Sequence, residues 1–388
     1  MGVGGMTHSQ VTIVVPGGFE ARQSGVSSFL RTVIPRWSAA HPTWRIVHQD
    51  VALVPGGEIN ENPVPSRRKR SSRPSPLRLV LGYFSEYRAN VRWLLRHVDR
   101  DFEGTVVLNT FGCEVLPISA RYALPKARII CIAHTRPGED ERGSHWIRRK
   151  VERLCARSAH GVVFHSVSAR DSWERKIERS FEQSWVIGHG VGDVPLEVPE
   201  SLHRSDGETR LDVVCVTRMV PGKGLQELLS VWKNLLPRAP RAARLVLVGD
   251  GPLRTALEEE VSVWGADADR VLFTGVMEAG ARAYNKAVAG VLLATEEEAF
   301  GLTVVEAMAC GTPVVVSNRG ALPELVADGG GVVVDVADQS TVANHLLALL
   351  ADHVRRAEMG KAAREVWRKT FSVTKMLDEY KRVFEGDA

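Results

Sequence analysis

The sequence predicts an α/β protein built from two doubly wound domains, each with a parallel sheet covered by helices. Short apolar runs rich in β-branched residues alternate with helix-length amphipathic stretches along nearly the whole chain. This alternation is typical of parallel sheets with right-handed crossovers. A chain of 388 residues is long enough for roughly two to three domains. The runs form two sets of about six, so two sheets are favoured over one very wide sheet.

The expected strands are short, bounded by Gly, Asp or Pro, and apolar enough to be buried on both faces. They cover residues 11–15, 45–51, 105–108, 128–133, 162–164, 185–187, 211–216, 245–248, 271–273, 290–294, 314–316 and 331–334. Helical periodicity marks residues 224–236, 253–264, 339–351 and 371–384. A stretch rich in Gly, Pro and charge separates the two sets of strands at residues 188–207. We therefore expect an N-terminal domain over 1–190 and a C-terminal domain over 191–368.

Composition excludes several classes of protein. The formal net charge of +4 is too small and too mixed in sign to indicate nucleic-acid binding. The five cysteines are scattered without paired spacing, which argues against a disulfide framework or a zinc site and fits a reducing compartment. Residues 1–10 lack the apolar segment of a secretory signal, and no apolar run approaches the length of a membrane span. We expect a cytoplasmic protein.

One segment interrupts the alternation. Residues 63–76 contain four prolines, and five basic residues lie between Arg67 and Arg73. The favoured interpretation is a solvated loop of the N-terminal domain, and the other is peripheral attraction to an anionic membrane. The following residues, 87–100, have the pattern of a basic amphipathic helix, for which an ordinary surface helix is favoured over one that lies on a membrane.

Loops that carry charged residues or glycines suited to ligand binding follow four expected strands of the second half. Ligands of doubly wound folds bind at the carboxyl ends of the strands, which makes these loops the place to look for a site. They carry Arg218 and Lys223; Gly249, Gly251 and Pro252; Gly275, Val276 and Met277; and Glu298, Phe300, Gly301, Leu302 and Glu306.

These loops can together hold a nucleotide diphosphate attached to a sugar. Arg218 can chelate phosphate oxygens and Lys223 supplies a point charge, while a helix that begins near Gly301 offers backbone N–H groups. Glu298 and Glu306 then accept hydrogen bonds from sugar hydroxyls. Taken singly, each feature is also an ordinary surface charge, a tight turn or part of an acidic patch. Their position in consecutive strand-end loops of one sheet favours a site.

Five motifs mark the second half: Arg218 with Lys223-Gly224, Gly249-Asp250-Gly251-Pro252, Glu298 to Glu306, Gly311-Thr312-Pro313-Val314 and Gly320-Ala321-Leu322-Pro323-Glu324. In these motifs the C-terminal half resembles that of retaining GT-B glycosyltransferases of family 4, the glycosyl transferases group 1. The resemblance implies two Rossmann-like domains that face a central cleft. It also implies that the helix at about 369–388 crosses back to the N-terminal domain.

For function, the resemblance implies transfer of a hexose-type sugar from a UDP- or GDP-linked donor to a hydroxyl of a small metabolite, lipid or polysaccharide. Transfer would retain the anomeric configuration and need no metal or other cofactor. Arg218 and Lys223 would hold the diphosphate, Glu306 the ribose and Glu298 the donor sugar. The backbone of Phe300, Gly301 and Leu302 would contact phosphate or sugar, and the residues from Gly275 to Met277, with Val276 between them, would lie beside the base.

The N-terminal half matches the family less closely. Gly17 and Gly18 resemble the glycine loop under the diphosphate, and His134 follows the strand where many relatives carry a histidine near the donor sugar. A packing role for His134 stays open. The alternative to an active enzyme is a catalytically silent GT-B protein that binds a nucleotide sugar or a partner, and the intact Arg218, Lys223, Glu298 and Glu306 set favours the enzyme. The sequence names neither the acceptor nor an oligomeric state.

Overall fold

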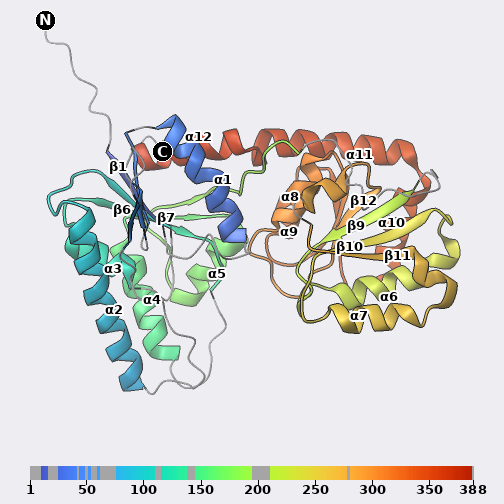
Figure 1. The fold of residues 1–388 in the computed structure, drawn as a ribbon, viewed down its shortest axis with the longest axis horizontal. Helices are drawn as coiled ribbons and strands as arrows, with labels where there is room; N and C mark the ends of the chain where they lie inside the picture. Colours follow the sequence, from blue (N-terminus) through green and yellow to red (C-terminus); the bar gives the residue numbers. More distant parts are fainter. Residues whose placement is uncertain are drawn as a thin grey trace, which may run out of the picture. The chain divides into compact units, whose positions relative to one another are not determined.

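The computed structural model describes residues 10–15, 25–41, 43–48, 51–53, 59–61, 76–109, 115–137, 145–194, 210–277 and 280–386. The chain divides into two compact units, the first formed by Met1–Ile187 with Leu377–Ala388 and the second by Gly188–Met376. Each unit contains one sheet with helices on its faces (Figure 1). The predicted architecture of two doubly wound α/β sheets is confirmed.

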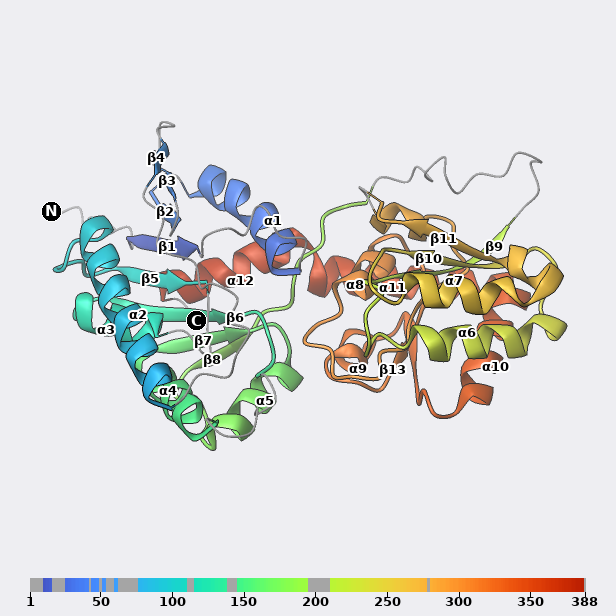
Figure 2. The ribbon, with the colours of Figure 1, turned by 60° about the horizontal axis from the view of Figure 1, so that its bottom comes forward.

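The sheet of the first unit has the strand order β4-β3-β2-β1-β5-β6-β7-β8 (Figure 2). Six of its strands are parallel: β1 (Val11–Val15), β2 (Arg45–His48), β5 (Thr105–Leu108), β6 (Arg128–Ala133), β7 (Gly161–Phe164) and β8 (Ser184–Val186). The prediction of one strand over residues 45–51 was wrong. β2 ends at His48, and β3 (Val51–Leu53) and β4 (Ile59–Glu61) extend the edge in antiparallel pairing.

Helices of the first unit are α1 (Gly25–Ala40), α2 (Pro76–His97), α3 (Leu116–Ala123), α4 (His145–Ser158) and α5 (Val167–Ile177). Against the sheet, Trp93 and Leu94 of α2 join a buried cluster with strand residues such as Val106 and Ile129. The helix predicted at residues 87–100 is longer at its start, because α2 already begins at Pro76. Residues 62–75, with the basic run from Arg67 to Arg73, lie outside the described residues.

The second sheet is entirely parallel, with the order β11-β10-β9-β12-β13-β14. Its strands are β9 (Leu211–Val216), β10 (Ala243–Val248), β11 (Val271–Gly275), β12 (Ala289–Leu292), β13 (Val314–Ser317) and β14 (Gly331–Val334). Renumbered along the chain, this order is 3-2-1-4-5-6, the dinucleotide-binding arrangement in which the crossovers change direction between strands 1 and 4. Ligands of such sheets bind at that switch point, which here lies between β9 and β12.

Helices cover both faces of this sheet: α6 (Leu225–Leu235), α7 (Arg254–Ser262), α8 (Leu302–Ala309), α9 (Leu322–Leu325), α10 (Gln339–Ala351) and α11 (His353–Val366). Trp232 of α6 and Leu346 of α10 belong to the apolar cluster on one face. Val305 and Met308 of α8 belong to the cluster on the other face, with Trp367. Burial on both faces explains why the strands are continuous apolar runs in the sequence.

The last helix, α12 (Val373–Glu385), enters the core of the first unit with its residues from Leu377 onward. The Thr105 hydroxyl donates to the Phe384 carbonyl at 2.8 Å, and the Arg128 guanidinium donates to the Val383 carbonyl at 2.7 Å. The Trp37 ring packs edge-on against Tyr380, with ring centroids 5.4 Å apart. None of the helices in the described part of the chain has the length and hydropathy that a bilayer crossing needs.

Candidate functional site

Five strand-end loops of the second unit are joined into one rim by their main chains. The Gly249 N–H donates to the Gly275 carbonyl at 2.8 Å, which links the loops after β10 and β11. The Met219 N–H donates to the Asp250 carbonyl at 2.9 Å, which links the loops after β9 and β10. Across the switch point, the loop after β12 donates from Thr295 to the Gly222 carbonyl at 3.0 Å. The loop after β13 closes the rim, because the Ala321 N–H donates to the Glu298 carbonyl at 2.9 Å.

Glycine is required where these loops touch. Gly224, at the start of α6, has a φ of +68°, and a Cβ atom there would lie 1.7 Å from the Leu293 carbonyl oxygen. At Gly249 a Cβ atom would lie 1.9 Å from the Thr217 carbonyl oxygen. At Gly320, with a φ of +57°, it would lie 2.1 Å from the Glu298 carbonyl oxygen. Backbone approach this close admits only glycine, so these residues fix the loops that carry Lys223 and Glu298.

Lys223 and Glu298 meet across the switch point. Lys223 lies in the loop after β9 and Glu298 in the loop after β12, and the Lys223 Nζ atom forms an ion pair with Glu298 Oε1. The side chains are 21% and 16% exposed, so the pair is half-buried at the edge of the site. The neighbouring acids Glu296 and Glu297 are exposed. The sequence assigned Lys223 and Glu298 to different parts of a ligand and did not anticipate their ion pair.

Glu306 lies in α8, the helix that follows the loop with Glu298, and is half-buried. Burial raises the pKa of its carboxyl group to about 7. Among the described residues no side chain or backbone group hydrogen-bonds to this carboxyl group. The nearby Tyr284 hydroxyl accepts from the Val216 N–H at 3.4 Å, and burial, with Cys215 and Glu306 adding to it, raises the Tyr284 pKa. A desolvated carboxyl group with unused acceptor capacity suits a ligand hydroxyl pair.

The other residues predicted for this site lie around the same rim. Arg218 is exposed in the loop after β9, Val276 is exposed, and Met277 is half-buried in the loop after β11. The Phe300 ring turns inward and packs edge-on against Phe371, with centroids 6.0 Å apart. Gly301 caps α8 with a φ of +101°, and Leu302 is the first helical residue, so their backbone N–H groups lie at the positive end of the helix dipole. Gly251, with a Cβ position 2.4 Å from the Met219 carbonyl oxygen, completes the rim.

In the first unit, polar side chains follow the carboxyl ends of three consecutive strands and form a hydrogen-bonded chain that ends on a backbone carbonyl after the fourth. Asn109 follows β5, His134 follows β6 and His165 follows β7. The Asn109 side-chain amide lies 2.6 Å from His134 Nε2, and His134 Nδ1 lies 3.0 Å from His165 Nε2. His165 Nδ1 is 2.9 Å from the carbonyl of Ile187, which follows β8.

The Ile187 carbonyl, at one end of this hydrogen-bonded chain, determines which nitrogen of each histidine ring carries a proton. The Ile187 carbonyl only accepts, so His165 Nδ1 carries a proton and His165 Nε2 accepts from His134 Nδ1. His134 Nε2 then accepts, and a half-turn of the Asn109 amide places the NH2 group opposite it, which also gives a partner to the otherwise unsatisfied buried Asn109 Nδ2. Burial lowers the pKa of His165 to about 4, and burial together with His165 lowers that of His134 well below its usual value. Both rings are therefore neutral near pH 7.

Sequence reasoning singled out His134 but missed Asn109 and His165. Each of the two directly follows an apolar strand, Asn109 after Leu108 and His165 after Phe164, and this position was the available signal. The predicted Gly17 and Gly18 lie outside the described residues, so the structure does not place them. The rim of the second unit brings together all the other predicted residues except His134.

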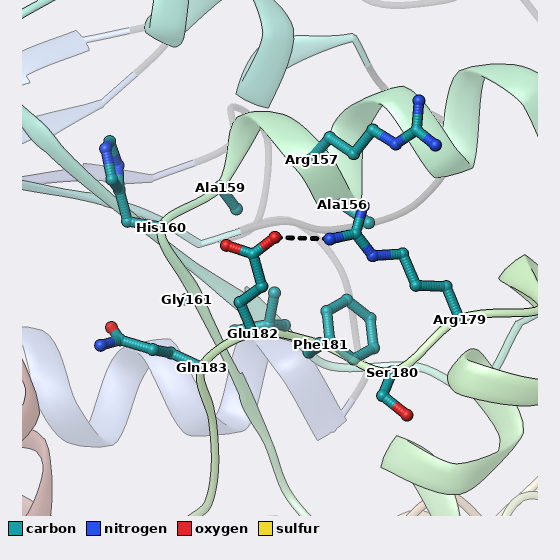
Figure 3. Close-up of a pocket in the computed structure, with 11 residues that line it drawn as sticks. Ala156, Arg157, Ala159, His160, Gly161, Arg179, Ser180, Phe181, Glu182 and Gln183 are labelled. Atoms are coloured by element: carbon teal, nitrogen blue, oxygen red, sulfur yellow. Dashed lines mark hydrogen bonds and ion pairs between the residues drawn. The ribbon is translucent and has the colours of Figure 1, made fainter.

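A small pocket in the first unit lies away from these residues (Figure 3). Its cavity of about 20 Å³ holds no more than a water molecule. Gly161, one of its lining residues, begins β7, so the pocket lies at the amino ends of the strands, opposite His134 and His165. The ion pair between Arg179 and Glu182 closes one side. The pocket is a packing defect rather than a ligand site.

Comparison with known proteins links the rim to a family. Residues 210–352 match the family model of the glycosyl transferases group 1. The GDP-mannose-dependent alpha-(1-6)-phosphatidylinositol monomannoside mannosyltransferase of Mycolicibacterium smegmatis is 37% identical over 161 residues, 39% of this chain and 42% of the relative. The N-acetyl-alpha-D-glucosaminyl L-malate synthase of Bacillus anthracis is 32% identical over 163 residues, 42% of each chain. The chain thus matches about two fifths of the length of these relatives.

Solved structures resemble the chain over nearly its whole length. HepE of Anabaena, crystallised with UDP and glucose, superposes with a TM-score of 0.70 at 18% identity and covers 97% of this chain and 99% of its own. Sucrose-phosphate synthase from Thermosynechococcus elongatus gives a TM-score of 0.71 at 19% identity, covering 97% of this chain and 98% of its own. At this identity the likeness concerns the fold, which is GT-B.

Proposed function

We propose that this chain is a glycosyltransferase, because residues 210–352 match the family model of the glycosyl transferases group 1 and curated glycosyltransferases resemble it there. It moves a hexose-type sugar from a nucleotide diphosphate to an acceptor hydroxyl. The observation that carries the proposal is the meeting of Lys223 and Glu298 at the switch point of the second sheet. A basic and an acidic side chain there match the two parts of the donor, a diphosphate and a polyhydroxylated sugar.

The second unit binds the donor in this proposal. Arg218 and Lys223 hold the diphosphate, together with the first backbone N–H groups of α8. Glu306 accepts hydrogen bonds from the ribose hydroxyls, and Glu298 accepts them from the donor sugar. Gly275, Val276 and Met277 lie beside the base through main-chain contacts. When the donor binds, Lys223 and Glu298 exchange part of their contact with each other for contacts with the phosphate and the sugar, respectively.

The transfer step breaks the bond between the anomeric carbon and the diphosphate oxygen and forms one to the acceptor oxygen. Negative charge grows on the departing diphosphate, and Arg218 and Lys223 stabilise it from fixed positions. The acceptor proton goes to the departing phosphate, and the sugar keeps its anomeric configuration. In this scheme neither glutamate is a nucleophile, and the positive charge of two side chains stands where other enzymes use a metal ion.

The neutral His134 ring contributes on the side of the first unit. It follows β6, and its ring is fixed by Asn109 and His165. We assign it a hydrogen-bonding role toward the donor sugar, which a neutral ring can perform without a charge that competes for the diphosphate. The proposed donor is UDP- or GDP-linked, in keeping with the GDP-mannose-dependent relative and the UDP complex of HepE. The proposed acceptor is a small metabolite, lipid or polysaccharide, and the proposed location is the cytoplasm.

Thermal unfolding in the presence of nucleotides tests the proposal. A ligand at 100 times its Kd adds about 2.7 kcal/mol to the free energy of unfolding. We expect UDP or GDP, and the matching nucleotide sugar, to raise the melting temperature, and ADP to have little effect. Glu306→Ala should abolish the rise, whereas Val263→Ala, at an exposed residue beyond α7, should preserve it. No response to any nucleoside diphosphate would contradict the proposal.

A further inference from the structure

Exposed large apolar side chains are concentrated on three neighbouring helices of the first unit. Among the described residues, eight of the fourteen such side chains belong to α2, α3 or α4. They are Leu77, Val80, Leu81, Phe84, Leu95, Tyr122, Trp146 and Leu154. Isolated exposed apolar residues are ordinary, but a cluster on adjacent helices indicates a surface that something covers.

The first half of α2 is apolar on its outer face. Leu77, Val80, Leu81 and Phe84 follow the spacing i, i+3, i+4, i+7, so they form one stripe, which we call the α2 ridge. Their exposed fractions run from 48% to 69%. The inner face of the helix is buried separately, through residues such as Tyr83, so the ridge is not needed for the core.

The α4 helix lies beside α2 and presents a similar face. Tyr83 of α2 and Ile147 of α4 share one buried apolar cluster, and both ribbon views show the two helices side by side (Figures 1 and 2). Trp146 is 52% exposed, and Lys150, one turn later, lies over its ring at 5.2 Å. Leu154 follows after another turn and is also exposed. Aromatic, basic and aliphatic side chains thus alternate along the outer face of α4.

Charge on these two helices is strongly positive. Lys and Arg number four in α2 and five in α4, against one Glu in each. Both glutamates turn inward, since Glu152 is buried and Glu86 accepts from the Val115 N–H at 3.4 Å. Arg149 and Arg153 are paired with Glu178. Arg88 and Arg92 of α2 and Lys150 of α4 are exposed, as are the apolar residues of the α2 ridge and Trp146 of α4.

We propose that α2 and α4 form a docking surface for an anionic lipid membrane. The α2 ridge and Trp146 enter the headgroup region, and the exposed Arg and Lys side chains contact lipid phosphates. Charge complementarity selects this occupant. A second copy of the same surface would oppose like charges, and a nucleic acid would leave the four apolar side chains of the ridge unused. The proposal concerns binding, so it does not depend on the proposed transferase activity.

The basic loop between Arg67 and Arg73, for which membrane attraction was one interpretation, directly precedes α2 in the sequence. Its residues lie outside the described part of the chain, so the docking surface is defined without them.

Sedimentation of the full chain with lipid vesicles tests the docking surface. We expect binding to vesicles of phosphatidylcholine mixed with phosphatidylglycerol, little binding to phosphatidylcholine alone, and a loss of binding as salt is raised. The double variant Leu81→Asp with Phe84→Asp should bind the mixed vesicles at least about tenfold more weakly, because two apolar contacts are replaced by charges that anionic lipid repels. Val263→Asp, at an exposed valine of the second unit, should bind like the wild type.

Further variants separate the occupants. Lys150→Glu with Arg92→Glu should weaken binding to anionic vesicles while the melting temperature stays that of the wild type, and Leu81→Ser serves if the aspartate variant unfolds. Equal binding of the wild type to neutral and anionic vesicles would overturn the proposal. So would unchanged binding of a folded ridge variant. Concentration-dependent dimerisation of the wild type that Phe84→Asp abolishes would instead assign the surface to a second copy.

Discussion

The Lys223 ammonium group and the Glu298 carboxylate, 75 residues apart in the sequence, form an ion pair across the switch point of the second sheet. The fold offers a matched ion pair at the opposite, amino ends of the strands of the same sheet. Arg244 of β10 donates to Asp212 of β9 at 2.7 Å, and these side chains are 12% and 16% exposed. The two ion pairs are similar in burial and differ in position. Comparing variants of the two pairs therefore distinguishes an effect on protein stability from an effect on catalysis.

Replacing Lys223 by Ala should lower kcat by about 10²–10³, because a fixed charge that stabilises the departing diphosphate is lost. Arg244→Ala should destabilise the protein to a similar extent and leave kcat within about twofold. Steady-state kinetics and thermal unfolding of both variants, with Glu298→Gln and the Lys223→Ala/Glu298→Gln double variant, measure this. Non-additive loss of kcat is expected for residues that contact one ligand. Equal kcat in the Lys223 and Arg244 variants would contradict the assignment.

The raised pKa of Glu306 predicts a pH-dependent stability. Between pH 4.5 and about 7 the unfolded carboxyl group has lost its proton while the folded one keeps it, so the stability that this group contributes falls as pH rises. The loss is of order 3 kcal/mol across that interval. Glu306→Gln removes the ionisation, and its free energy of unfolding in urea should fall less than that of the wild type. Parallel curves for the two proteins would show that Glu306 does not titrate this way.

His165 predicts the opposite slope over nearly the same interval. The unfolded ring takes up a proton below pH 6.5, whereas the folded ring resists it to about pH 4, so stability is lost as pH falls. The contribution is again of order 3 kcal/mol. The contribution of Glu306 to stability has the opposite sign over nearly the same pH range. The contribution of His165 is therefore measured as the difference in unfolding free energy between the wild type and His165→Gln at each pH. Asn109→Asp should reduce the acid loss, since a carboxylate beside His134 favours the charged ring, whereas Asn109→Leu should not.

Comparing Gly320 with Gly265 distinguishes the stability cost of a left-handed backbone from that of a steric clash at the added Cβ atom. Both have left-handed backbone, with φ of +57° and +64°, but a Cβ atom at Gly265 meets nothing within 4 Å, while at Gly320 it meets the Glu298 main chain. Gly265→Ala should cost about 1 kcal/mol of stability, the ordinary price of this conformation. Gly320→Ala should cost about 2 kcal/mol more and weaken donor binding, because Glu298 must move. Thermal unfolding and calorimetric titration with the donor check this, and equal losses in both variants would exclude a role for the close contact.

Most of the sheet could be predicted because its strands are buried on both faces. The runs at 128–133 and 331–334 coincide with β6 and β14. The run at 45–51 did not, because hydrophobicity alone does not reveal that β3 pairs antiparallel with β2 rather than continuing it. The start of α2 was missed for a related reason: the α2 ridge makes the helix apolar on two faces and removes the amphipathic pattern that sequence analysis looks for.

Sequence spacing singled out Glu298 from its acidic neighbours but could not give its ion pair with Lys223. That contact depends on β9 and β12 being adjacent, which is a matter of strand order rather than local sequence. The hydrogen bonds that link Asn109, His134 and His165 were not predicted for the same reason. A single polar residue after a strand is common, and only the neighbouring positions of β5, β6 and β7 bring the three side chains together.

The return of α12 to the first unit sets an order of events during synthesis. The second unit is continuous in the chain, whereas the first one needs residues from Leu377 onward to cover Trp37 with Tyr380 and Phe384. At about 5–20 residues per second, the ribosome needs roughly 10–40 s to make the intervening second unit. Throughout that time the nascent first unit carries an uncovered aromatic surface. The unit made first is therefore the one that finishes folding last. Chaperone binding would matter most in the interval before α12 has been synthesised.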